Sequence, residues 1–248
     1  MKQKGLSSFG LKYIALLTMT IDHIGAIFLT YGSLPYSIAR GIGRIAFPIF
    51  CFLLVEGFRH TSNRRSYFLR LLLFAFLSEI PFDAALFQFP QVTDPSILFS
   101  HQNVFFTLAL GFLALCLLEK YWWDGFFLRL FIPLCFCGLA ELLHTDYSMV
   151  GVMVILLFYC LEINAGYHGT LEGNRYTFSV IAYPVLLLLL AYGNVFVALA
   201  IPFLSLYNGK KGNPLPNGKS FPGAKYLFYW YYPMHLLVFA LARFLFIQ

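Results

Sequence analysis

The chain is built from long, nearly unbroken runs of apolar residues separated by short polar segments. A bilayer core about 30 Å thick needs about 20 apolar residues per helix. Because the runs are continuous and do not alternate, they indicate helices rather than the strands of a barrel. They predict nine spans, at residues 11–31, 38–58, 66–87, 103–119, 126–143, 147–163, 178–192, 194–208 and 226–247. The seventh and eighth runs are short and nearly joined, so a count of eight or ten stays open.

The positions of lysine and arginine predict how these helices are oriented. With the N-terminus in the cytoplasm, most cations fall in cytoplasmic segments, whereas the outer segments hold Arg40 and Arg44, with Arg243 near the C-terminus. This asymmetry follows the positive-inside rule. We therefore expect a cytoplasmic N-terminus and an outside C-terminus. The net charge of +6 is then explained by topology, and nucleic-acid binding is not expected.

Composition excludes the common soluble classes. The 248 residues are 60% hydrophobic and 11% charged, whereas a soluble domain is about 45–50% apolar and about 25% charged. A soluble enzyme, a DNA-binding module, a secreted disulfide scaffold and a disordered protein are therefore excluded. No segment between the runs is long enough for a core of its own. The sequence predicts an all-α, multi-pass bundle in the cell membrane, with residues 1–248 as a single domain.

Placing an ionisable side chain at the centre of a membrane-spanning helix costs about 2.5–3.5 kcal/mol. The ionisable residues at membrane depth are therefore the informative ones. Asp22 and His23 lie in the second half of the first run. They fit a buried pair that ties this helix to Arg44 or another cation. They equally fit a proton-accepting histidine whose basicity an acidic neighbour adjusts. The sequence leaves both interpretations open.

Two further polar groups lie toward the predicted outer face. Arg40 and Arg44 are one helical turn apart at the start of the second run, and Arg44 needs an acidic partner or an anionic ligand. Glu79 and Asp83 lie on either side of a proline near the end of the third run. Two carboxylates one turn apart repel each other. The residues fit an architectural role and a ligand site equally well.

The other polar residues and the cysteines are weaker indications of a functional site. His235 lies near the middle of the last run and is more typical of structure than of chemistry. Asp146 and Tyr147 belong to a polar corner between the fifth and sixth runs. The five cysteines all fall inside apolar runs and are interpreted as small packing residues. No spacing typical of metal ligands is found, so no metal is expected.

At this point several motifs resemble one known family. They include Asp22-His23-Ile24-Gly25, the segment from Arg40 to Phe50, and the Ser-Glu-Ile-Pro-Phe-Asp block that ends at Asp83. Gln102-Asn103 and the terminal segment from Lys225 to His235 continue the pattern. In this order, over nearly the whole chain, the motifs resemble the TraX family.

The resemblance implies a function. The founding TraX protein is known as the acetylase of the pilin N-terminus, and the family is grouped with polytopic acyltransferases. It implies transfer of an acyl group from cytosolic acyl-CoA, here acetyl-CoA, to an amine or hydroxyl acceptor at or across the membrane. A peptide N-terminus, a glycan and a small molecule all stay open as the acceptor.

Acyl transfer needs a base, donors for the developing oxyanion and cations for the phosphates of CoA. On this interpretation His23 is the base, Asp22 orients or charges the site, and Arg44 and Asn103 polarise the thioester carbonyl. His235 is a second acid/base candidate. We expect acceptor contacts at Arg40, Glu79, Asp83, Asp146 and Tyr147, and phosphate contacts at Lys210, Lys211, Lys219 and Lys225.

Two other classes of function compete. In a proton- or substrate-coupled transporter, Asp22, Glu79, Asp83 and the histidines would relay protons or bind the substrate. Transporters commonly show paired repeats and matching broken helices, and neither is visible in this sequence. The third possibility is a scaffold without catalytic activity in a surface-modification or secretion complex. Binding of acetyl-CoA separates the acyltransferase from the other two classes.

Overall fold

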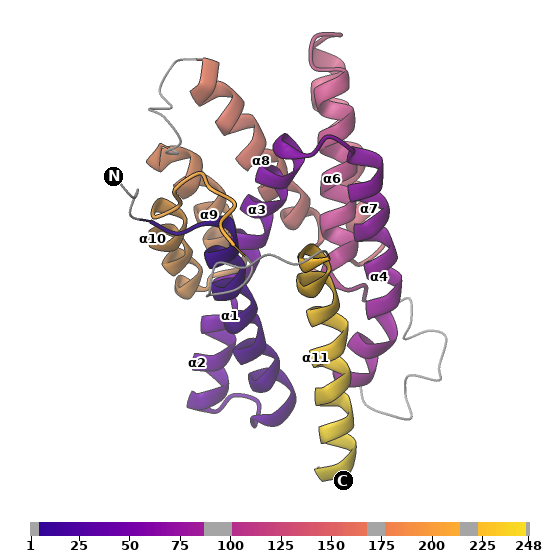
Figure 1. The fold of residues 1–248 in the computed structure, drawn as a ribbon, viewed down its shortest axis with the longest axis vertical. Coiled ribbons are helices and arrows are strands. Elements are labelled where there is room, and N and C mark those ends of the chain that lie inside the picture. The colour runs from indigo at the N-terminus through magenta and orange to yellow at the C-terminus, as the bar shows by residue number, and fades with distance from the viewer. Residues whose placement is uncertain (1–4, 87–100, 168–176, 214–222, 247–248) are drawn as a thin grey trace. The chain divides into compact units, whose positions relative to one another are not determined.

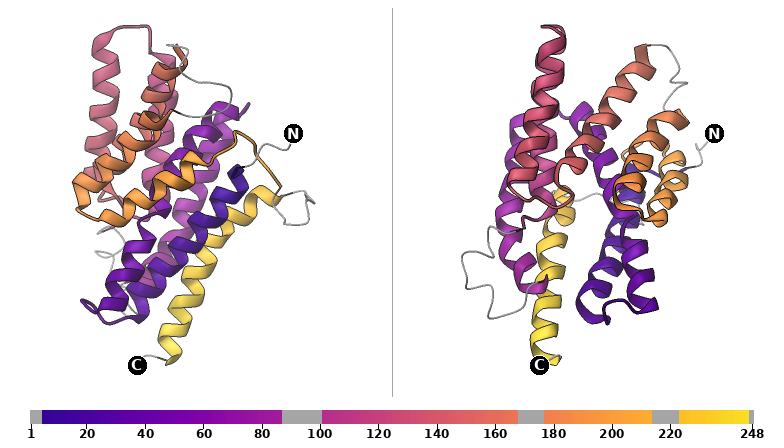
Figure 2. Two further views of the ribbon diagram at one scale, coloured as in Figure 1. Left: turned by 90° about the vertical axis from the view of Figure 1, so that its left-hand side faces the viewer. Right: turned by 180° about the vertical axis from the view of Figure 1, so that it is seen from behind.

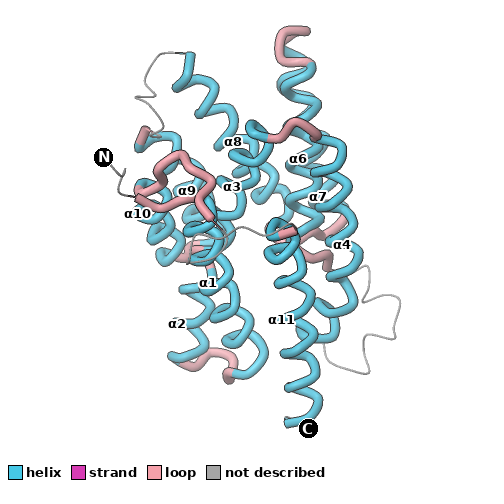
Figure 3. The backbone as a smooth tube through the Cα atoms, in the orientation of Figure 1, coloured by secondary structure: helices cyan, strands magenta, loops and turns pink. Residues whose placement is uncertain are grey.

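The structure is a computed structural model that describes residues 5–86, 101–167, 177–213 and 223–246. Within these ranges every named element is helical, and the only β-type pairing consists of two isolated bridges (Figure 3). The expectation of an all-α protein is therefore confirmed.

Each predicted apolar run corresponds to one helix or to two consecutive helices (Figure 1). The helices are α1 (Ser8–Phe28), α2 (Leu34–Gly43), α3 (Ala46–His60), α4 (Arg64–Leu86), α6 (Val104–Lys120), α7 (Phe126–Leu142), α8 (Ser148–Tyr167), α9 (Phe178–Tyr192), the 3₁₀ helix η2 (Val195–Leu199), α10 (Ala200–Ser205) and α11 (Ala224–Phe246).

Two of the predicted runs are interrupted, and in each a proline lies shortly after the break. The second run divides into α2 and α3 at Arg44 and Ile45. Pro48 has no N–H for the carbonyl of Arg44, four residues earlier, and its ring crowds that carbonyl. In the eighth run, Pro202 has the same relation to Ala198, where η2 gives way to α10. The sequence contains both prolines, but hydrophobicity continues through both breaks.

Three helical stretches in the described residues are long and apolar enough to cross a membrane. They are Ser8–Phe28, Leu34–His60 and Ser148–Ala165, whereas Phe178–Tyr192 and Val195–Ser205 are apolar but shorter. Large apolar side chains also remain exposed, such as Phe127 at 83% and Leu190 at 81%. Such a surface suits lipid rather than water. The chain is therefore a membrane protein.

The chain forms two compact units. Unit 1 comprises Met1–Leu53 and Cys160–Tyr231, and unit 2 comprises Leu54–Tyr159 and Tyr232–Gln248. The limits of the units fall inside α3, α8 and α11. Each unit is described separately below. The expectation of one domain over residues 1–248 stays a prediction.

In unit 1, α1 and α2 pack side by side as a hairpin (Figures 1 and 2). Small residues allow the two helices to approach closely. A Cβ atom added to Gly25 would lie 2.7 Å from the Cβ of Ala39. One added to Gly43 would overlap the Cβ and carboxylate of Asp22. The absence of a side chain at Gly43 therefore places Asp22 directly against α2.

Gly43→Ala should destabilise the protein by about 1–3 kcal/mol, because the new methyl group has to displace Asp22 or separate the helices. Gly138→Ala is the matched control, since Gly138 also lies inside a helix but has nothing within 4 Å of an added Cβ. The control should melt at the wild-type temperature or slightly above it. Thermal melting of both variants in detergent tests this prediction. Equal melting of Gly43→Ala and wild type would contradict the close packing at Gly43.

In unit 2, α4 packs against α6 and α6 against α7. Aromatic side chains hold the bundle together, since Phe58 contacts Phe112 edge-to-face with ring centroids 5.4 Å apart. Tyr159 lies 5.6 Å from Phe58 in the same geometry. At one end of the bundle, Arg64 forms an ion pair with Glu119. These contacts fix α4, which carries Glu79 and Asp83, and α6, which begins directly after Asn103.

Candidate functional site

In unit 1 the residues of interest are Asp22, His23 and Arg40, which we call the histidine site. Nη1 of Arg40 lies 2.5 Å from Oδ2 of Asp22, and their side chains are 26% and 16% exposed. The pair joins α1 to α2 where Gly43 permits close contact. The sequence suggested Arg44 or another cation as the partner of Asp22, and Arg40 is one such cation. The structural interpretation of Asp22 is supported, and its role beside His23 stays a prediction.

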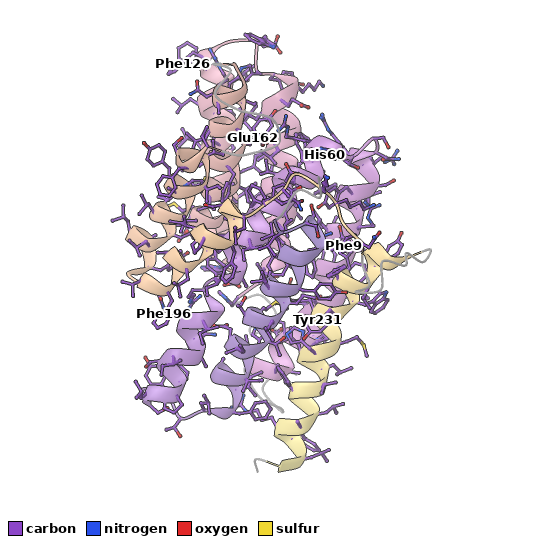
Figure 4. All side chains as sticks on the ribbon, turned by 60° about the vertical axis from the view of Figure 1, so that its left-hand side comes forward. Phe9, His60, Phe126, Glu162, Phe196 and Tyr231 are labelled. Atoms are coloured by element: carbon purple, nitrogen blue, oxygen red, sulfur yellow. The ribbon has the colours of Figure 1, made fainter. Side chains whose placement is uncertain are left out.

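His23 is buried in the second half of α1, with 8% of its surface exposed. One helical turn away, Oγ1 of Thr20 and the hydroxyl of Tyr231 are 2.7 Å apart. Tyr231 comes from the part of α11 that belongs to unit 1 (Figure 4). His23 is thus a titratable ring inside an apolar helix, with a hydroxyl pair on the neighbouring turn.

Arg44 lies at the end of α2, where the chain breaks before α3. It is half-buried, and its backbone N–H donates to the carbonyl of Gly41 at 3.1 Å. It therefore lies one turn beyond Arg40 in the same unit as His23. The prediction that Arg44 polarises a carbonyl stays a prediction.

The start of α1 is bound to the segment that carries Lys210 and Lys211. The N–H of Ser8 donates to the carbonyl of Lys210 at 2.9 Å, and the N–H of Phe9 donates to the carbonyl of Lys211 at 3.1 Å. The first N–H groups of a helix have no hydrogen-bond acceptor within the helix. The carbonyls of Lys210 and Lys211 accept hydrogen bonds from two of these groups in α1. Both lysine side chains are exposed. The helix that bears His23 thus begins beside two accessible cations.

For the other two predicted lysines, contact with the phosphates stays a prediction. Lys219 lies outside the described residues, and Lys225 lies in the first turn of α11. A cation that we did not predict is Lys12, whose Nζ lies 5.1 Å from the ring centroids of both Phe9 and Phe228. Its position at the very start of the first apolar run, one turn into α1, was the available signal.

In unit 2, Glu79, Asp83 and Asn103 form what we call the carboxylate site. Nδ2 of Asn103 donates to the carbonyl of Ala75 at 2.8 Å and to Oε2 of Glu79. Its backbone N–H also donates to Oε2 of Glu79, at 3.3 Å. Oδ1 of Asn103 accepts from the N–H of Phe105 at 3.0 Å and so caps α6. Both side-chain N–H bonds are engaged, so a thioester carbonyl would have to displace one of them.

Asp83 lies one helical turn beyond Glu79 and is fully buried. Neither of its carboxylate oxygens has a hydrogen-bond partner among the described residues, and the same holds for Oε1 of Glu79. Buried polar groups are nearly always paired, because an unpaired one costs free energy. Three unpartnered oxygens on two neighbouring carboxyl groups are therefore the most unusual feature of unit 2.

The predicted polar corner ties α6 to the turn between α7 and α8. The N–H of Asp146 donates to the carbonyl of Gln102 at 2.8 Å, and Thr107 donates to the carbonyl of Asp146. Oδ1 of Asp146 accepts from the N–H of Tyr147 at 3.1 Å and lies 3.9 Å from Nε2 of His101. Tyr147 has a φ of 61°, a conformation that residues with a side chain rarely adopt. These contacts give Asp146 a structural role, and contact with an acceptor stays a prediction.

His235 lies among aromatic rings in α11 and is 9% exposed. Its ring centroid is 5.7 Å from that of Tyr232 and 5.6 Å from that of Phe239. Tyr232 in turn contacts Phe105 edge-to-face at 5.2 Å. Such packing suits a structural histidine, as the sequence suggested, and a role in acid/base chemistry stays a prediction.

Comparison with known proteins now identifies the family. The model of the family described as "TraX protein" matches residues 7–243. The "Probable fimbrial assembly protein FimC, serogroup H1" of Dichelobacter nodosus is 32% identical to this chain over an alignment of 257 positions, gaps included. The alignment covers 96% of each protein. No solved structure matches the chain. The resemblance seen in the sequence is therefore confirmed, and the chain belongs to the TraX family.

Proposed function

We propose that this protein is a multi-pass membrane acyltransferase that moves an acetyl group from cytosolic acetyl-CoA to an amine or hydroxyl acceptor. The proposal includes nine spans, a cytoplasmic N-terminus and an outside C-terminus. Because the relative in Dichelobacter nodosus is named as a fimbrial assembly protein, we further propose that the acceptor belongs to the assembly of a surface fibre.

One observation carries the proposal: a single helix links two accessible cations to a buried histidine. Lys210 and Lys211 are attached by their carbonyls to the first turn of α1, and His23 lies 15 residues after Ser8. At a rise of about 1.5 Å per residue, the helix covers about 22 Å between these points. Acyl-CoA is a long molecule with phosphates at one end and its thioester at the other. In this proposal the phosphates of acyl-CoA lie at Lys210 and Lys211, and its thioester lies near His23.

The chemistry assigns a role to each residue of the histidine site and to Arg44. His23 takes the proton of the acceptor while the acceptor nitrogen or oxygen attacks the thioester carbonyl carbon. Arg44 donates hydrogen bonds to the carbonyl oxygen as its negative charge grows. When the carbon–sulfur bond breaks, His23 returns the proton to the sulfur that leaves with the electron pair. Arg40 holds Asp22, and so holds α1 in a fixed rotation relative to α2.

Reversing the charge of both lysines, with Lys210→Glu and Lys211→Glu combined, should raise the KM for acetyl-CoA at least about tenfold. The kcat should stay within about twofold, because contacts remote from the thioester bind the ground state and the transition state equally. Lys120→Glu is the control, since Lys120 is also an exposed lysine, at the end of α6. Transfer of labelled acetyl groups in membranes measures both constants. An unchanged KM in the double variant would contradict phosphate binding at this loop.

The unpartnered carboxylates favour a transporter as a second candidate, because intramembrane carboxylates often mark ion pathways. A transporter would carry a solute or protons across proteoliposomes that contain no acyl-CoA. The acyltransferase requires acyl-CoA for any turnover. Uptake without acyl-CoA, together with no acetyl transfer, would favour the transporter.

A further inference from the structure

Unit 2 holds two buried carboxyl groups that no cation among its described residues pairs with. Asp83 is fully buried and Glu79 is 8% exposed. Three of their four carboxylate oxygens have no hydrogen-bond partner within the described ranges. The two groups are one helical turn apart on α4, so ionisation of both is opposed by their mutual repulsion. Desolvation and repulsion act together at this point, so the arrangement is costly unless something completes it.

No cation from the described part of the chain pairs with these two carboxyl groups. None of its lysines, arginines or histidines forms an ion pair with Glu79 or Asp83. Arg243 comes near this end of α4, but its Nη1 donates to the backbone carbonyl of Ala85 at 3.0 Å. Asn103 contributes hydrogen bonds to Glu79 but no charge.

The carboxyl group of Glu79 is also held in a fixed position. Asn103 binds Oε2 of Glu79 through its backbone and its side chain, and is itself anchored to Ala75 and Phe105. Oε1 of Glu79 is left unpartnered and buried, as are both oxygens of Asp83. Oxygens held in place without donors are the ligands that hard cations prefer.

The ligand set indicates the charge of the cation. Divalent cations usually take more oxygen ligands or retain several waters, and no group of three or more His, Cys, Asp or Glu residues gathers for a metal among the described residues. Two carboxylates in a membrane protein, with one oxygen already bound to an amide, suit a monovalent cation. In transporters, intramembrane Asp and Glu residues mark ion pathways, and Na⁺ is coordinated by oxygen ligands near the bilayer midplane.

We propose that Glu79 and Asp83 bind a monovalent metal cation of the size of Na⁺ within unit 2. The ion receives Oε1 of Glu79 and the two oxygens of Asp83, and its positive charge offsets part of the repulsion between the two carboxylates. This assignment gives the two residues a role other than the contact with an acceptor that the sequence suggested. It is independent of the acyltransferase proposal, because it concerns only residues of the carboxylate site.

The test compares thermal melting of the detergent-purified protein in sodium chloride and in choline chloride at equal ionic strength. A ligand that binds only the folded state raises the melting temperature. Na⁺ at about ten times its dissociation constant should raise it by about 3–6 °C relative to choline. Potassium chloride, magnesium chloride and calcium chloride, at matched ionic strength, serve as further arms.

Asp83→Asn and Glu79→Gln should each abolish the difference between sodium and choline. In choline, Asp83→Asn should melt at or above the wild-type temperature, because it removes an unneutralised charge, and this result also shows that the variant folds. Asp124→Asn, at an exposed turn, should keep the full sodium effect. Binding of radioactive Na⁺ to the same samples should follow the same order.

Three outcomes would overturn the proposal. One is equal melting of the wild type in sodium and choline. The second is an undiminished sodium effect in Asp83→Asn. The third is stabilisation by Mg²⁺ or Ca²⁺ with none by Na⁺, which would contradict the monovalent assignment.

Discussion

His23→Ala should reduce acetyl transfer by at least about 100-fold, because the acceptor then has no group to take its proton. His23 is the one histidine within α1 and is 8% exposed, inside a helix long and apolar enough to cross a membrane. A buried imidazole at this depth is costly to maintain without a role. The readout is the transfer of labelled acetyl groups in membranes, normalised to the amount of folded protein.

Two comparisons separate chemistry from packing in this experiment. His23→Gln fills more of the space than alanine but cannot act as a base at neutral pH, so it should be as inactive as His23→Ala. His60→Ala is the matched control, because the side chain of His60 is 71% exposed at the end of α3. It should keep wild-type activity. Wild-type turnover in His23→Gln would contradict the assignment of the base, and loss of activity only in His235→Ala would move that role to α11.

The second large effect concerns stability. Asn103→Asp should destabilise the protein by about 3 kcal/mol, although it changes only one atom of the side chain. Aspartate keeps the acceptor that caps α6 through the N–H of Phe105. It loses both N–H donors and places a second carboxylate against Glu79. Thermal melting in detergent measures the loss.

Asn194→Asp is a closely matched control for this substitution. Asn194 caps η2 by accepting from the N–H of Phe196 at 3.0 Å, which is the contact that Asn103 makes with Phe105. Its side chain has no carboxylate in hydrogen-bond contact among the described residues, so the control should melt within about 1 kcal/mol of the wild type. Adding Glu79→Gln to Asn103→Asp should restore part of the stability, because an amide would again face a carboxylate. No loss in Asn103→Asp would show that the bonds to Glu79 contribute little.

The helices could be predicted from the sequence because their apolar runs are long and continuous. The first run is α1, and the run at residues 178–192 coincides with α9. The breaks were missed because hydrophobicity continues through them. The prolines that follow them do not distinguish these runs, since Pro81, Pro133, Pro184 and Pro233 lie inside continuous helices. The number of spans and their direction across the membrane depend on where the bilayer lies. The bounds of the helices do not show the position of the bilayer.

The candidate sites were predicted as residue types, but their partners were not. The sequence indicated that Asp22 needs a cationic partner and suggested Arg44 or another cation. It did not single out Arg40, one turn before Arg44. The rotation of α2 against α1, set at Gly43, brings Arg40 to Asp22. Asn103 was identified but given a chemical role, although its place before an apolar run is typical of a helix cap. Its bonds to Ala75 and Glu79 join segments far apart in the chain, which no local pattern encodes.

The central claim is that this protein uses acyl-CoA, and thermal melting of the detergent-purified protein tests it most directly. The samples contain acetyl-CoA, CoA, ATP or no ligand, because a ligand of the folded state raises the melting temperature by mass action. An acyltransferase that uses acetyl-CoA should show a clear rise with acetyl-CoA and CoA and none with ATP. No rise at millimolar acetyl-CoA, in protein that is demonstrably folded, would contradict the acyltransferase and favour transport or scaffolding.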